Sequence, residues 1–213
     1  MLGGLRQPVK GGVMKTRVFA VCVVVFLFCG ITHAGLSDGL VAYYPFNGNA
    51  NDESGNRNNG TVNGSTLTTD RFGNANCAYS FDGVNDYITI QESDILKVTS
   101  ELTITTWVKI NSITSSLNLF SMSTPKTSPN CCAYGQPYEL DIFNGKIGLT
   151  SWTSNTSFKT FFGNSLLSLD KWYHVAVTFN KGIINIFLNG TLDDNGSIPI
   201  TRCSSFFLQN YGR

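Results

Sequence analysis

The chain has 213 residues, a length that suits one domain with a sizeable core. Its 15 Lys and Arg nearly balance its 14 Asp and Glu, and no basic cluster occurs, so the composition argues against a nucleic-acid partner. The sequence also lacks a phosphate-cradling glycine loop and a dinucleotide fingerprint, which excludes the common nucleotide-binding classes.

The first recognisable element is an apolar run over residues 18–31 (VFAVCVVVFLFCGI) that follows Lys15 and Arg17. Basic residues, a run of this length and a small residue at Ala34 predict a secretory signal peptide cleaved after Ala34. An uncleaved anchor is the alternative, although the run is shorter than the about 20 apolar residues of a membrane span. We expect the rest of the chain to be secreted, or located in the periplasm or at the cell surface, without membrane insertion.

Residues 1–13 carry no pattern, so we expect translation to start at Met14 and residues 1–34 to be leader and signal. The remaining 35–213 would form one domain. Removal of the four basic residues of the leader leaves 11 Lys and Arg against 14 Asp and Glu, a formal charge of −3.

After the leader, short runs rich in Val, Ile, Thr, Phe and Tyr alternate with clusters of Gly, Asn, Asp and Ser. This pattern is typical of an all-β sandwich or barrel. The predicted strands, in chain order, are 40–46, 77–81, 87–90, 102–110, 117–122, 138–143, 146–150, 172–179, 183–188 and 205–209.

Turn residues predict two hairpins within this series. Asn144-Gly145 joins YELDIF to KIGLT, and Asn180-Lys181-Gly182 joins HVAVTF to IINIFL; Asn-Gly favours tight turns because both residues tolerate positive φ. Polar, glycine-rich residues 49–66 and proline-rich residues 123–137 are predicted loops.

Four cysteines follow the leader: Cys77, Cys131, Cys132 and Cys203. An even number in an exported chain predicts two disulfides. Adjacent cysteines rarely bond each other, so we expect Cys131 and Cys132 to pair separately with the other two, in either order. Free buried thiols are the alternative.

Three collinear stretches resemble one family: 39–90 (GLVAYYPFNGNANDESGN… through …FDGVNDYITI), 101–111 (ELTITTWVKIN) and 171–192 (KWYHVAVTFNKGIINIFLNGTL). They are similar to the laminin-G-like domains of bacterial secreted proteins, in the concanavalin A-like lectin/glucanase superfamily. The resemblance implies a jelly-roll sandwich of two antiparallel sheets and a binding role, often towards sugars or extracellular glycoconjugates and often with calcium. The family continues with a further strand where this chain stops at Arg213, so we expect a domain that lacks its last strand and a fragment of a longer reading frame.

Calcium ligands are predicted in the loop that starts near residue 47. Asp52, Asn49 and Asn56 lie there with Asn47, Ser54 and Asn58, and hard cations prefer such oxygens. Ordinary Asx turns in a solvated loop are the alternative.

A catalytic role is not expected. Some glucanases of this superfamily use Glu-x-Asp-x-(x)-Glu on one strand, but Glu139-Leu140-Asp141 is not followed by a second Glu. His174, the one histidine after the leader, lies inside a predicted strand and is expected to be structural.

Aromatic residues outside the obvious core are the predicted ligand-binding groups. A flat ring against the apolar face of a sugar, with Asn or Asp nearby, is the usual arrangement of such sites. We predict this role for Trp152, Trp107, Tyr134 and Tyr138, with packing in the core as the alternative for each ring. The expected function is non-catalytic recognition of an extracellular glycan or glycoprotein; a structural or adhesive protein-binding module and a glycoside hydrolase are the alternatives.

Overall fold

The computed structural model describes residues 35, 37–96, 101–113, 116–121, 138–152 and 158–198, with the side chain of Trp152 left out. The chain divides into two compact units, Met1–Leu40 and Val41–Arg213. In the first, residues 37–39 form a turn, and the Asp38 amide donates to the Gly35 carbonyl. The described residues include no helix long and apolar enough to cross a bilayer.

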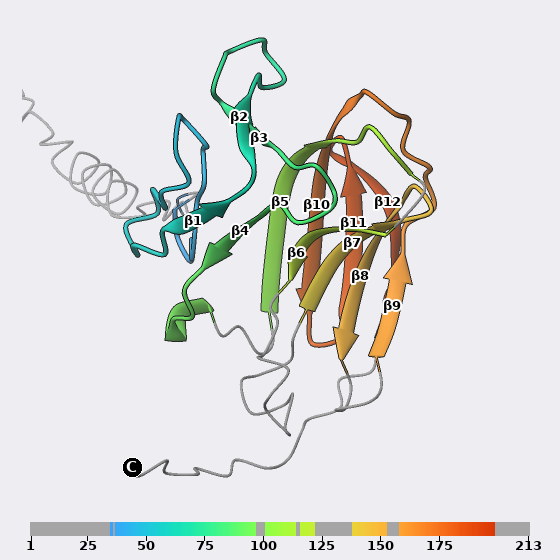
Figure 1. The fold of residues 1–213 in the computed structure, drawn as a ribbon. Helices are drawn as coiled ribbons and strands as arrows, with labels where there is room; N and C mark the ends of the chain where they lie inside the picture. The colour runs from blue at the N-terminus through green and yellow to red at the C-terminus, as the bar shows by residue number, and fades with distance from the viewer. Residues whose placement is uncertain are drawn as a thin grey trace, which may run out of the picture. The chain divides into compact units, whose positions relative to one another are not determined.

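Among the described residues of the second unit, every regular element except one 3-10 turn is a β-strand, which confirms the predicted fold class (Figure 1). The 3-10 turn, η1, spans Asp94–Leu96. The strands are β1 (Gly60–Asn63), β2 (Thr66–Thr68), β3 (Ala78–Ser80), β4 (Tyr87–Ile90), β5 (Glu101–Lys109), β6 (Leu117–Ser121), β7 (Tyr138–Phe143), β8 (Lys146–Trp152), β9 (Phe158–Phe162), β10 (Trp172–Asn180), β11 (Ile183–Leu188) and β12 (Thr191–Ser197).

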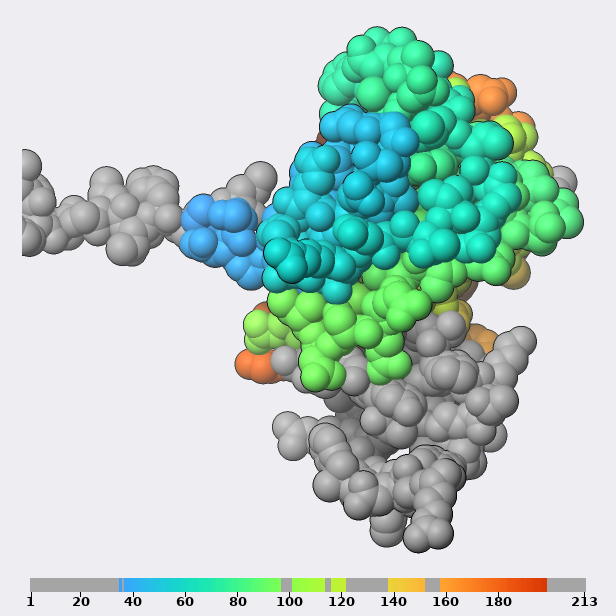
Figure 2. Space-filling view, turned by 60° about the vertical axis from the view of Figure 1, so that its left-hand side comes forward, coloured from blue at the N-terminus to red at the C-terminus, as the bar shows by residue number. Residues whose placement is uncertain are grey.

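Two four-stranded antiparallel sheets form a jelly-roll sandwich, one in the order β12-β11-β10-β5 and the other in the order β6-β7-β8-β9. In Figure 1 the β6–β9 sheet lies in front. Two small antiparallel pairs, β1-β4 and β2-β3, precede them. The space-filling view shows residues 41–90 of this unit gathered on one face (Figure 2).

The core lies between the two four-stranded sheets and is built from alternate residues of their strands. Its buried members come from both sheets and from the connections at their edges: Ile110, Tyr138, Leu140, Ile142, Ile147, Leu149, Leu167, Val175, Val177, Phe179, Ile184, Ile186 and Ile198. Complete burial of each aliphatic side chain contributes about 1.5–3 kcal/mol, so this cluster is the main source of stability.

The predicted hairpin turns are present. Asn144 and Gly145 have φ values of 51° and 77°, and Lys181 and Gly182 have 47° and 93°, as a tight turn between antiparallel strands requires. A third turn of this kind, Asn189-Gly190, joins β11 to β12. Strand β12 was not predicted, and neither were β1, β2 and β9.

The predicted strand at 40–46 is wrong. Residues 41–46 are irregular because their backbone bonds to a loop instead of to a neighbouring strand. The Tyr43 amide donates to the Asp52 carboxylate at 2.9 Å, and the Tyr43 carbonyl accepts from the Glu53 amide at 2.8 Å. The predicted loop at 49–66 contains β1 and the start of β2, while the predicted strand at 205–209 lies outside the described residues.

Candidate functional site

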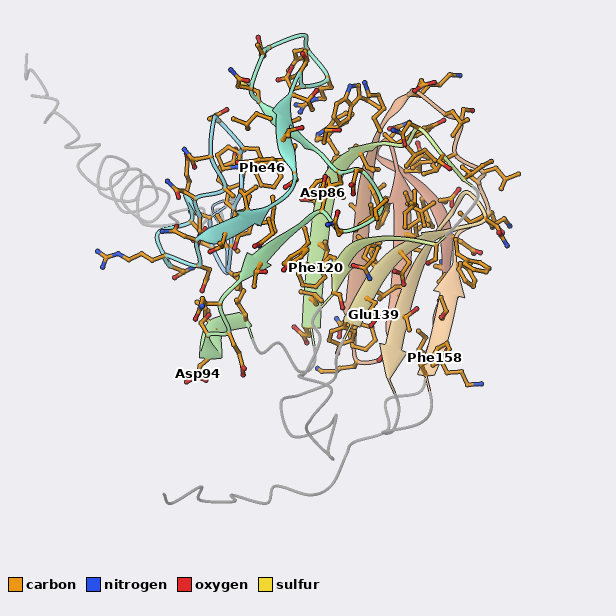
Figure 3. The ribbon with its side chains drawn as sticks, viewed as in Figure 1. Phe46, Asp86, Asp94, Phe120, Glu139 and Phe158 are labelled. Atoms are coloured by element: carbon orange, nitrogen blue, oxygen red, sulfur yellow. The ribbon has the colours of Figure 1, made fainter. Side chains whose placement is uncertain are left out.

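The outer face of the β6–β9 sheet combines aromatic rings with a polar cluster. In β7, Tyr138, Leu140 and Ile142 point into the core, so Glu139 and Asp141 point outward. Figure 3 shows Glu139 on β7 and Phe158 at the start of β9, on the two sides of β8. The register aligns four outward positions in one row across the sheet: Asn118, Asp141, Gly148 and Phe162.

Phe162 forms an aromatic platform at one end of this row. A Cβ atom on Gly148 would lie 2.8 Å from both Cδ1 and Cε1 of Phe162, so the ring can rest on the sheet only because residue 148 is glycine. Phe162 nevertheless remains 38% exposed. One side of the ring therefore packs on Gly148 while the rest is open to solvent.

The polar cluster lies beside this platform. Asn118 Nδ2 donates to Asp141 Oδ1 at 3.0 Å, and Thr150 Oγ1 lies 3.5 Å from Asp141 Oδ2. The Thr150 hydroxyl also shares a 2.8 Å hydrogen bond with the Thr160 hydroxyl. Thr150 is buried on this face of the sheet, so the network fixes the position of the carboxylate.

Asp141 is the electrostatically unusual member of the cluster. Burial raises its pKa above the ordinary aspartate range, and the negative charge of Glu139 raises it further. The hydrogen bonds from Asn118 and Thr150 oppose this rise without cancelling it. The oxygens of the Asp141 carboxyl group can accept hydrogen bonds from hydroxyl groups of a ligand.

Two more rings flank the site. Phe143 is 47% exposed and its centroid lies 6.0 Å from that of Phe162. Phe158 is 56% exposed and pairs across the sheet with Trp152, the predicted ligand-binding residue at the end of β8. None of these three phenylalanines was a predicted ligand-binding residue, although the aromatic content of FKTFF, which holds Phe158 and Phe162, is typical of a strand.

A glycosidase arrangement is incomplete on this face. Glu139 and Asp141 both point outward, as a catalytic Glu-x-Asp pair would. The positions at which the motif requires a second Glu hold Phe143, whose ring belongs to the platform, and Asn144, which forms the hairpin turn.

Tyr138 is not a ligand-binding residue, and that prediction is wrong. The side chain is completely buried and its ring packs 4.9 Å from that of Phe179 on the other sheet. Burial raises the pKa of Tyr138 to about 12. Its position follows from alternation, because residue 138 shares a face with Leu140 and Ile142.

Trp107 lies on the outer face of the other sheet, away from the Phe162 platform. It is 43% exposed, as the alternation of β5 predicts, and its ring lies 5.2 Å from that of His174. The Arg71 guanidinium lies 4.2 Å from the Trp107 ring centroid. Tyr134, the fourth predicted aromatic, lies outside the described residues.

The polar groups of the predicted calcium ligands bond to the loop itself, and the calcium site stays a prediction. The Asp52 carboxylate accepts the amides of Tyr43 and Ser54 on Oδ1, and the amide of Asn58 on Oδ2, each at 2.9 Å. The Asn49 side-chain oxygen accepts the amide of residue 51 at 2.8 Å, and the Asn56 side-chain amide donates to the Val41 carbonyl at 3.0 Å. A search of the described residues finds no group of three His, Cys, Asp or Glu side chains able to hold a metal.

Hydrogen bonding also determines the charge state of Asp52. Burial alone would raise its pKa, but the amides of Tyr43, Ser54 and Asn58, together with the Ser54 hydroxyl, lower the pKa below the ordinary value. Asp52 is therefore a carboxylate that organises the loop, as the Asx-turn alternative supposed.

Cys77 is a half-buried free thiol in this structure, and its Sγ lies 3.4 Å from the Ala75 carbonyl. The other three predicted disulfide cysteines, Cys131, Cys132 and Cys203, lie outside the described residues. The two disulfides stay a prediction.

A family model described as "Concanavalin A-like lectin/glucanases superfamily" matches residues 82–209. A search of the curated proteins finds no match to the sequence.

Solved structures with similar folds include domain 4 of AbnA, a GH43 extracellular arabinanase from Geobacillus stearothermophilus, in complex with arabinotriose. That domain is 19% identical with a TM-score of 0.56, and the alignment covers 74% of this chain and 75% of the domain. The receptor-binding domain of botulinum neurotoxin C/D mosaic serotype is also 19% identical with a TM-score of 0.56, over 76% of this chain and 40% of that one. The binding domain of Paraclostridial Mosquitocidal Protein 1 is 18% identical with a TM-score of 0.54, over 77% of this chain and 41% of that one. This chain thus spans less than half the length of the two toxin domains, and at these identities the likeness concerns the fold.

Proposed function

Since the chain belongs to the concanavalin A-like lectin/glucanase superfamily, we propose that it is a non-catalytic recognition domain that binds a glycan on the outer face of its β6–β9 sheet. The single observation that carries the proposal is the Phe162 ring seated on Gly148 beside the Asp141 cluster. A pyranose or furanose ring has an apolar face that can lie on the exposed side of Phe162.

The polar cluster supplies the hydrogen bonds that such a ligand requires. Asp141 stands two strands away from Phe162 in the same row, and Asn118 follows it on the next strand. A sugar that lies on the exposed side of Phe162 and extends along the row would therefore present its hydroxyl groups to the carboxylate and the amide. Removal of either group leaves hydroxyls of the bound sugar unpaired, which makes the row a determinant of affinity.

The comparisons support a binding role for this fold, because the similar solved structures are an arabinanase domain seen with arabinotriose and the binding domains of two kinds of toxin. The absence of a second Glu at positions 143 and 144 supports recognition without hydrolysis. The predicted signal peptide supports a location outside the cytoplasm.

A glycan array of neutral oligosaccharides, followed by calorimetric titration of each hit, tests the proposal. We expect Phe162→Ala and Asp141→Ala each to weaken binding about tenfold or more, by loss of a ring contact or a charge-assisted hydrogen bond. Val84→Ala, which removes an exposed side chain from the loop between β3 and β4, is the matched control. An array without hits, or hits that both site variants bind as tightly as the wild type, would refute glycan binding at this face.

Hydrolysis is tested with the same oligosaccharides. We expect no product after prolonged incubation. Release of reducing sugar by the wild type that disappears in Glu139→Gln would show an enzyme instead.

A further inference from the structure

A second cluster lies on the outer face of the other sheet, around Arg71 in the connection from β2 to β3. The Arg71 guanidinium carbon lies 4.0 Å from the centroid of the Phe72 ring and 4.2 Å from that of Trp107 on β5. Both contacts are cation–π interactions, and together they hold the guanidinium against the sheet. Arg71 thus brings this connection into contact with β5.

Arg71 has no acidic partner among the residues that the structure describes, where its contacts are the two rings. A guanidinium carries five N–H donors in its plane, and aromatic rings that pack on the group do not accept hydrogen bonds from all of them. Phe72 is 72% exposed, so the cluster is open to solvent. The N–H groups are therefore available to an anion from outside.

Lys109 adds positive charge to the same face, next to two rings that pack together. The His174 ring packs beside that of Trp107, with ring centroids 5.2 Å apart. Lys109 follows Trp107 on the same side of β5, and its Nζ lies 5.4 Å from the Trp172 ring centroid. The nearest acid in the sequence, Asp70, uses its carboxylate to accept the amides of Phe72 and Asn74 and the Asn74 side chain.

From this geometry we propose that the Arg71–Trp107 cluster is a second binding site, for a saccharide that carries a carboxylate. The carboxylate would pair with the N–H groups of Arg71, since a guanidinium matches its two oxygens in a bidentate arrangement. The exposed part of the Phe72 ring would lie against the sugar. Because the two rings already restrain the Arg71 side chain, little further ordering is required on binding.

The site is separate from the Phe162 platform. Both sheets bury their inner faces against one core, so their outer faces point away from each other. The charged groups next to the two sites also differ, since Glu139 and Asp141 stand beside the Phe162 platform and Arg71 and Lys109 beside Trp107. An acidic oligosaccharide is therefore expected to bind at the Arg71–Trp107 cluster in preference to the Phe162 platform.

The test is calorimetric titration of the full chain with trigalacturonic acid and with its fully methyl-esterified form, in which each carboxylate is replaced by an uncharged methyl ester. We expect the acid to bind and the ester to bind at least about tenfold more weakly, because charge-assisted bidentate pairing is lost. Arg71→Gln should weaken binding of the acid by a similar factor and Arg71→Lys by less, while Val84→Ala, at an exposed position outside both sites, leaves it unchanged. Thermal melting of each variant checks that the fold is retained.

Equal binding of the acid and the ester would overturn the proposal, as would wild-type affinity in Arg71→Gln. Inorganic phosphate is the third arm of the test. If phosphate displaces the acid at equal concentration, the cluster is a general anion site and the assignment to carboxylate sugars fails. Arg71→Gln should still bind neutral glycans, because the function proposed for the β6–β9 face does not use Arg71. A failure of the carboxylate site can therefore be told apart from a failure of glycan binding at the β6–β9 face.

Discussion

Phe162 rests on Gly148, and this contact connects a glycine in the middle of a strand to the candidate binding surface. Glycine inside a strand weakens it, so its presence at the centre of the β6–β9 sheet requires a local reason. The close approach of the Phe162 ring is that reason.

Gly148→Ala is therefore expected to lift the Phe162 ring from the sheet, because the new methyl group would lie 2.8 Å from two ring carbons. Binding of a neutral glycan should weaken about tenfold, since a well-placed aromatic contact contributes about 0.5–1.5 kcal/mol and 1.4 kcal/mol corresponds to tenfold. Calorimetric titration measures the loss. The double variant Gly148→Ala/Phe162→Ala should bind no more weakly than Phe162→Ala alone; additive losses would contradict the mechanism.

Asp141→Asn is expected to stabilise the protein at neutral pH. Burial and then the charge of Glu139 raise the pKa of Asp141, so the folded protein holds this proton more tightly than the unfolded chain does. The stability that this group contributes is complete below its unfolded pKa and is lost as the pH rises through the folded pKa. The variant keeps the oxygen that accepts from Asn118 and never ionises.

Urea unfolding at pH 3, 5 and 7 measures this effect. The variant should exceed the wild type in free energy of unfolding at pH 7, and the difference should shrink at pH 3. Glu53→Gln, which neutralises an exposed carboxylate, is the control. A variant that is less stable than the wild type at pH 7 would show that the ionised form is the favoured one.

Tyr138→Ala should lower the free energy of unfolding by about 3–5 kcal/mol, the usual cost of replacing a large buried aromatic residue by Ala. The loss follows from complete burial of the ring and its packing against Phe179 across the core. Chemical denaturation measures it, with Val84→Ala as an exposed control. At temperatures where the variant remains folded, its glycan affinity should equal that of the wild type, and a selective loss of affinity would return Tyr138 to the binding site.

Strands with clear alternation were predictable, and so were the turns that joined them. Leu102, Ile104 and Val108 fall on the inner face of β5 as their spacing predicts, and Asn144-Gly145 adopts the expected positive φ values. The same rules could have located β12, because Asn189-Gly190 is an equally strong turn signal. The segment TLDDNGS is mostly polar and has no fully buried residue, so it lacks the apolar alternation by which a strand is usually recognised.

The binding face was less predictable, because it depends on which strands become neighbours. Alternation alone places Tyr138 with Leu140 inside the sandwich, a signal that was present in the sequence and overlooked. The row from Asn118 to Phe162, in contrast, combines four strands whose order and register no local pattern specifies. The contact of Arg71 with Trp107 likewise joins residues that are distant in the sequence.

Asp52 accepts a hydrogen bond from the Tyr43 amide and so holds the irregular segment around Tyr43 against the loop. Asp52→Asn should destabilise the protein by about 1–3 kcal/mol, because the charged acceptor of three backbone amides is lost. The hydrogen bonds lower the pKa of Asp52, so its contribution is present above the unfolded pKa and disappears as the pH falls through the folded pKa. The stability gap between wild type and variant, measured by urea unfolding, should accordingly be widest near pH 7 and close in strong acid. Added calcium should leave the melting temperature of the wild type unchanged, since the Asp52 oxygens already accept amides; a calcium-dependent rise that Asp52→Asn abolishes would instead establish this loop as a metal site.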